Sequence, residues 1–87
     1  MAGSMKYRSR TDIVSQMLET ANGGASKTKI MYGAYLSYAQ LKEYLIVLTE
    51  GGLIEFQPNE QKYKTTEKGL KFIKTYSQIG QMISPTV

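Results

Sequence analysis

Two lysines near the start of a predicted short helix are well placed to bind an anion. Lys27 and Lys29 stand on either side of Thr28, which is expected to cap a helix. Ammonium groups beside the free backbone N–H groups of a helix start suit a phosphate. We therefore expect Lys27 and Lys29 to contact phosphate; the alternative is that both are simply solvated.

A second set of polar residues opens the next segment, namely Ser37, Tyr38, Gln40 and Lys42. Gln can read adenine through two hydrogen bonds, whereas Ser and Tyr more often bind phosphate. Structural roles compete with these, because Ser37 and Gln40 form a Ser-x-x-Gln capping box and Tyr38 can equally belong to the core. Glu43 either reads cytosine or pairs with Lys42. Only weak reading of base sequence is expected here.

A third candidate site lies in a predicted hairpin and consists of Asn59, Lys62 and Lys64. Lysines on such a hairpin add affinity for a phosphate backbone whatever the base sequence. Glu60, at the tip, opposes this attraction. The alternative is an ordinary solvated turn.

A short basic run precedes the first predicted helix. It consists of Lys6, Arg8 and Arg10. Such a run is either a flexible arm that reaches into a groove of a nucleic acid or a solvated segment.

The composition excludes most catalytic and metal chemistry. The 87 residues include no His and no Cys, which removes zinc sites, disulfides, thiol nucleophiles, imidazole bases and haem ligation. No glycine-rich phosphate loop is present. With 11 Lys and Arg against 7 Asp and Glu, the net charge is +4. We therefore expect a basic binding module and not an enzyme, with no metal, cofactor or small-molecule ligand.

One small domain is expected over residues 6–87. Residues 1–5 are interpreted as a cloning remnant, because a second methionine stands at position 5. A hydrophobic content of 41% is typical of a globular chain. No segment approaches the roughly 20 apolar residues of a membrane span, and the N-terminus lacks the apolar region of a signal peptide. A cytoplasmic protein without membrane contact is predicted.

Two helices are expected to position the first lysines. The first begins at Thr11 or one residue before it, with Thr11 as a candidate cap, and it stops at 22–24, where one Asn and two Gly follow each other. The second covers residues 29–34, with Thr28 as its cap. With no disulfides in so small a chain, the stability must come from helix packing or from a partner subunit.

A third helix and a hairpin follow. The helix begins after Ser37 and ends near residue 50, and its buried stripe is Leu41, Leu45 and Leu48. Alternating residues at 53–57 and 61–65 predict two strands joined by a turn. Most of the seven tyrosines fall at spacings expected to face the core, so base stacking on single strands is the lesser interpretation.

A last helix is expected over about residues 66–83, with Thr66 as its cap. Its apolar positions step by 4, 3 and 4, the spacing of a coiled-coil seam; they are Phe72, Tyr76, Ile79 and Ile83. Left exposed, this stripe would promote aggregation, so we expect it to form a homodimer interface. Spacing alone does not decide between parallel and antiparallel pairing.

The predicted fold class is α+β and mostly α: a winged helix-turn-helix with a C-terminal dimerisation helix. Two short helices joined by a tight turn, followed by a β-hairpin, have this layout. Nucleic-acid binding is the leading interpretation of that layout. The alternative is a winged-helix module that binds proteins in a transcription or replication complex without touching DNA.

Residues 27–34 and 36–38, together with the Thr-Glu-Lys-Gly run at 66–69, resemble an archaeal family of small winged-helix proteins. The resemblance implies binding of double-stranded DNA, as a transcriptional regulator or a small chromatin protein of the nucleoid. It places the third helix in the major groove and the hairpin wing on flanking backbone. In the chromatin branch a long C-terminal helix pairs antiparallel with its twin; the helix expected here has only about 18 residues.

Overall fold

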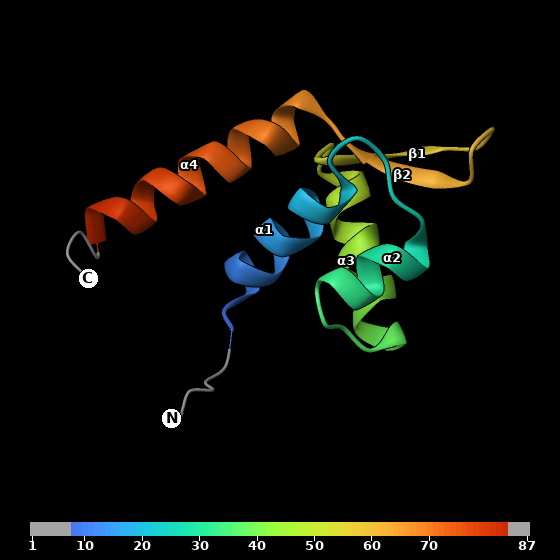
Figure 1. Ribbon diagram of the computed structural model, residues 1–87, viewed down its shortest axis with the longest axis horizontal. Coiled ribbons are helices and arrows are strands. Elements are labelled where there is room, and N and C mark those ends of the chain that lie inside the picture. Colours follow the sequence, from blue (N-terminus) through green and yellow to red (C-terminus); the bar gives the residue numbers. More distant parts are fainter. Residues whose placement is uncertain (1–7, 84–87) are drawn as a thin grey trace.

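The computed structural model describes residues 8–83, and side chains up to residue 79 (Figure 1). Residues 1–5 and Lys6 lie outside the described residues, as does the side chain of Ile83. Four helices and one antiparallel hairpin form a winged helix that is mostly helical, which confirms the predicted winged helix-turn-helix architecture. The elements in chain order are α1 Arg10–Ala21, α2 Lys27–Gly33, α3 Tyr38–Glu50, β1 Ile54–Gln57, β2 Lys62–Thr65 and α4 Glu67–Ile83.

Serines cap the first two helices: α1 begins at Arg10, within its predicted range, whereas α2 begins at Lys27, two residues before its predicted start. Ser9 precedes α1 and forms a capping box with Asp12, in which each side chain bonds the backbone N–H of the other residue at 3.0–3.1 Å. Ser26 precedes α2 and accepts a 3.1 Å hydrogen bond from the N–H three residues on. The predicted caps, Thr11 and Thr28, are therefore wrong. Serine is the stronger capping residue, and the reciprocal carboxylate bond adds to it at α1.

The core lies between α1, α2 and α3, under the first strand of the hairpin. The predicted stripe of α3 is confirmed, because Leu41, Leu45 and Leu48 are all buried. The largest fully buried side chains are Met17, Leu18, Ile30, Leu41, Leu48 and Ile54. Figure 1 shows α4 running away from this group of helices, past α1.

Helices α2 and α3 end in the same motif with different residues at its central position. In α3, the N–H groups of Gly52 and Leu53 bond the carbonyls of Thr49 and Leu48, and Gly52 has a φ of 76°. This is a Schellman motif, whose left-handed residue is usually Gly. At the end of α2, the corresponding residue is Tyr35, with a φ of 55° and the same two bonds one helix earlier.

The hairpin is joined to the helices at two points. Ala25, in the loop before α2, exchanges two backbone hydrogen bonds with Tyr63 of β2, at 2.8 and 2.9 Å. At the end of β2, the buried hydroxyl of Thr65 donates to the Leu18 carbonyl of α1 at 2.6 Å. The wing is therefore held against the α1–α2 loop and cannot be positioned independently of it.

The start of α4 is packed tightly against the end of the hairpin. Thr66 caps the helix, as predicted, by accepting a 3.1 Å hydrogen bond from the Gly69 N–H. A Cβ at Gly69 would clash with the Leu53 carbonyl oxygen and lie 2.6 Å from the Thr65 Cγ2. Further along, the Tyr76 hydroxyl donates to the Asp12 carboxylate of α1. The close packing at Gly69 and the hydrogen bond between Tyr76 and Asp12 thus set the direction in which α4 leaves the domain.

The predicted apolar stripe of α4 is divided between the domain and the solvent. Phe72 is half-buried against the core, and Tyr76 is half-buried beside α1. Ile79 retains 48% of its accessible surface. No helix in the described part of the chain has the combination of length and hydropathy needed to cross a membrane.

Replacing Gly69 with Ala is expected to lower the free energy of unfolding by about 2 kcal/mol, because the backbone carbonyl of Leu53 cannot easily give way. Chemical denaturation followed by circular dichroism measures the change. Ser77→Ala, at an exposed position of the same helix, is the control and should shift stability by less than about 0.5 kcal/mol. Equal stability of Gly69→Ala and the parent would contradict the close packing.

Candidate nucleic-acid interface

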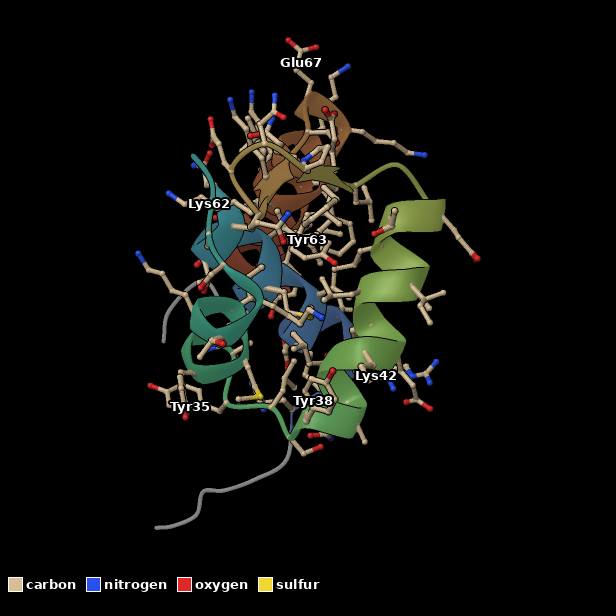
Figure 2. The ribbon with its side chains drawn as sticks, turned by 90° about the vertical axis from the view of Figure 1, so that its right-hand side faces the viewer. Tyr35, Tyr38, Lys42, Lys62, Tyr63 and Glu67 are labelled. Carbon is tan, nitrogen blue, oxygen red and sulfur yellow. The ribbon has the colours of Figure 1, made fainter. Side chains whose placement is uncertain are left out.

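The contact between Ala25 and Tyr63 brings lysines from distant parts of the sequence onto one edge. Lys27 and Lys29 lie in the first turn of α2, directly after the bridged loop, and both are exposed. Lys62 precedes Tyr63, and its side chain lies over this loop, with Cδ 3.8 Å from the place of a Cβ on Gly24 (Figure 2). We call Lys27, Lys29 and Lys62 the basic edge.

The other predicted wing residues contribute less positive charge to this edge. Lys64 stands directly opposite Glu55 in the strand register, so the two charges partly balance. Lys62 stands opposite neutral Gln57. Asn59 is exposed in the turn of the hairpin, beside Glu60. The wing therefore presents its positive charge mainly through Lys62.

The first turn of α3 is occupied by its own cap. The Ser37 Oγ accepts from the Gln40 N–H at 3.2 Å, and the Gln40 Oε1 accepts from the Ser37 N–H at 3.0 Å. This confirms the predicted capping box. It also engages the amide oxygen that Gln40 would use, together with its amide nitrogen, to read adenine.

Tyr38 lies on the surface of α3, so the core alternative for this residue is wrong. Its side chain is 56% exposed, and the Lys42 Nζ lies 5.5 Å from the centre of its ring (Figure 2). A cation at this distance over an aromatic face is attracted by the ring. Tyr38 and Lys42 together place a hydroxyl, a ring face and a positive charge at the start of α3.

The rest of the outward surface of α3 is mainly apolar or acidic. Ile46 and Val47 are more than half exposed, and Glu43 and Glu50 are exposed as well. A shallow groove of about 430 Å³ between α1 and α3 is lined by Arg10, Val14, Glu43, Tyr44, Ile46 and Val47. Positive charge is thus confined to the beginning of the helix.

Arg8 and Arg10 do not form a flexible arm. Arg10 is the first residue of α1 and lines the groove beside Glu43. The Arg8 guanidinium donates to the Ala34 carbonyl at 2.5 Å, to the Tyr35 carbonyl at 3.0 Å and to the Gln16 side chain at 2.6 Å. Arg8 is therefore fixed to the turn between α2 and α3.

The expectation that most tyrosines face the core is wrong for the described residues. Tyr32, Tyr35 and Tyr38 are 69%, 76% and 56% exposed, and all three lie at the turn between α2 and α3. The sequence held a signal for one of them, since Tyr35 follows the predicted end of a helix, where side chains commonly point to solvent. Helical spacing alone does not reveal the exposure of Tyr32 and Tyr38.

The fold and this arrangement define a winged helix-turn-helix protein with a basic edge. The family model described as winged helix-turn-helix matches residues 7–84, and the chain belongs to that family. It is 27% identical over 78 residues to an uncharacterized protein of Methanocaldococcus jannaschii, a match that covers 88% of this chain and 78% of the relative.

A solved structure has the same fold. Sso10a-2, described as a DNA-binding protein from Sulfolobus solfataricus, superposes with a TM-score of 0.80 at 21% identity. The match covers 90% of this chain and 84% of that protein. At this identity the likeness establishes a shared architecture.

Substitutions at Ser37 test its capping role. Ser37→Ala should lower the free energy of unfolding by about 1 kcal/mol, because the Gln40 N–H loses its acceptor. Ser37→Asp should retain nearly full stability, since Asp caps helices as well as Ser does. Urea denaturation measures both variants. Full stability of Ser37→Ala would contradict the capping role.

Proposed function

We propose that this chain binds double-stranded DNA without catalysis. The observation that carries the proposal is the basic edge: the bridge from Ala25 to Tyr63 brings Lys62 beside the loop that leads into the first turn of α2, which carries the exposed Lys27 and Lys29. Membership of the winged helix-turn-helix family and the fold shared with a DNA-binding protein support it. We propose that it acts at the nucleoid.

In the proposed complex, the beginning of α3 enters the major groove and the wing lies along the flanking backbone. Lys27 and Lys29 contact phosphates beside the start of α2, and Lys62 contacts the backbone from the wing. Tyr38 and Lys42 approach phosphates or base edges from α3. These contacts position the protein more than they read a sequence.

Weak sequence preference follows from the surface of α3. Gln40 is engaged in the helix cap, and Glu43 and Glu50 are repelled by phosphates. Affinity therefore comes mainly from lysine–phosphate contacts, which are independent of sequence. This favours the role of a small chromatin protein over that of a regulator with a single strict site.

We further propose a homodimer formed through the outer face of α4. Ile79 is half-exposed and lies on the same side of the helix as Phe72 and Tyr76, because steps of three and four residues return to one side. The helix extends beyond the domain, where a second copy can reach it (Figure 1). Burying apolar side chains from both helices contributes about 1.5–3 kcal/mol for each large side chain, before the costs of association.

Replacing Lys27 and Lys29 with Gln should weaken duplex binding and make it less dependent on salt. Loss of two phosphate contacts should reduce the slope of log affinity against log salt by about 2. Fluorescence anisotropy with a labelled 20-base-pair duplex between roughly 50 and 200 mM salt measures both effects. The matched control is Lys71→Gln with Lys74→Gln, which removes two exposed charges from α4 and should change the slope far less.

Two results would contradict the proposed duplex binding. One is the absence of detectable binding at 50 mM salt, which would favour a protein-interaction module. The other is equal loss of affinity in the basic-edge pair and the α4 pair, which would assign binding to net charge alone.

Ile79→Glu should dissociate the dimer, because it places a carboxylate in the proposed apolar interface. Sedimentation equilibrium at micromolar concentration should give about twice 9.8 kDa for the parent and about 9.8 kDa for the variant. Ser77→Glu, also exposed on α4, is the control for added charge. A monomeric parent protein that still binds DNA would refute the interface.

A further inference from the structure

Tyr35 occupies a position that the fold would fill more easily with another residue. It is the left-handed residue of the Schellman motif that ends α2, and its φ is 55°. The same position at the end of α3 holds Gly52. Gly and Asn adopt this conformation with less strain than a residue as bulky as Tyr. The backbone therefore does not explain the tyrosine.

Packing does not explain it either. The Tyr35 side chain is 76% exposed, the largest exposed fraction among the described large hydrophobic side chains. A side chain that contributes so little to the core, at a strained backbone position, indicates a role outside folding. An aromatic ring facing solvent is suited to contact with another flat surface.

Arg8 holds the backbone of Tyr35 and places a cation beside its ring. The guanidinium bonds three neutral acceptors, so these contacts fix its position without cancelling its charge. Its Cζ lies 6.0 Å from the centre of the Tyr35 ring. The ring therefore projects from a fixed turn next to a positive charge.

A second ring and cation stand three residues along the chain. Tyr38 is paired with Lys42 in the same way, and Figure 2 shows Tyr35 and Tyr38 at the same end of the molecule. Tyr32, 69% exposed on α2, adds a third ring to this turn. We call Tyr32, Tyr35 and Tyr38 the tyrosine platform. Glu43, the nearest acidic residue along α3, lines the groove with Arg10 instead.

We infer that the tyrosine platform stacks on unpaired bases, so that the chain binds single-stranded DNA in addition to duplex DNA. Exposed aromatic rings with neighbouring cations provide both contacts that single strands need: a face for the base and a charge for the phosphate. Bases in an intact duplex are stacked on each other and offer no free face. The inference rests on the proposed DNA binding for its electrostatic part only.

The test compares two labelled 15-nucleotide strands that carry the same number of phosphates. One is oligothymidine, and the other has an abasic site at every position. Anisotropy titrations at low salt should show that the parent protein binds oligothymidine at least about fivefold more tightly, because only that strand has bases to stack. Equal affinities would mean that charge alone holds the strand, and would overturn the inference.

Variants at Tyr35 assign the effect to the platform. Tyr35→Asn should abolish most of the difference between the two strands, whereas Tyr35→Phe should preserve it, because stacking needs the ring and not the hydroxyl. Val47→Asn, which changes an exposed side chain of α3 away from the turn, should also preserve it. A preference for oligothymidine that survives in Tyr35→Asn would overturn the role of Tyr35.

Two further measurements distinguish this inference from a structural role of Tyr35 and from the proposed duplex binding. The melting temperature of Tyr35→Asn should be equal to or above that of the parent, since Asn relieves the strained backbone; a clear fall would show that Tyr35 serves the fold and would overturn the premise. Duplex affinity should be unchanged in Tyr35→Asn. Duplex binding without a preference for bases refutes the platform alone, whereas absence of duplex binding refutes the proposed function.

Discussion

Two hydrogen bonds between Ala25 and Tyr63 determine where the positive charge of this protein lies. They attach the loop before α2 to the second strand of the wing, across 38 residues of sequence. Without them, the lysines at the start of α2 and the lysine in the wing would belong to separately moving segments. With them, Lys27 and Lys62 belong to one rigid edge, and a net charge of only +4 is sufficient to give a defined electropositive surface.

The surface of α3 changes character along its length. Its first turn combines a ring, a cation and a capped helix start, and its later turns present Ile46, Val47 and acidic groups. Such a helix has few groups that distinguish one base pair from another. The same division explains why affinity and specificity need not go together in this fold. Lysines outside α3 provide the affinity, while α3 itself provides little sequence specificity.

Much of the fold was predictable because local signals and packing agree. The α3 stripe, its capping box and the two strands of the hairpin each follow from spacing, and the structure has all three. The capping residues of α1 and α2 were missed because Ser and Thr both fit a cap, and the choice depends on backbone geometry at Ser9 and Ser26. Side-chain exposure was harder still: nothing local to Tyr35 reveals that Arg8, 27 residues away, holds its backbone.

The candidate site was predictable in its residue types and less so in its grouping. Lys27 and Lys29 follow from their place near a helix start, and the wing lysines from the hairpin. The pairing of Lys64 with Glu55 depends on strand register, and the engagement of Gln40 depends on its rotamer. Both reduce the contribution of residues that the sequence ranks as equal to their neighbours. Long-range contacts, which a single sequence does not display, decide these differences.

The absence of a side chain at Gly69 has a consequence at a larger scale. Because α4 packs closely against Leu53 there and is hydrogen-bonded to Asp12 through Tyr76, its orientation relative to the domain is fixed. Two copies joined through their α4 helices would hold their DNA-facing surfaces at a fixed separation and a fixed relative rotation. Such a dimer would fit two sites on the duplex that are separated by a fixed number of helical turns. The dimer would then be sensitive to the spacing and relative rotation of its two contact sites on the duplex, even without a preference for base sequence.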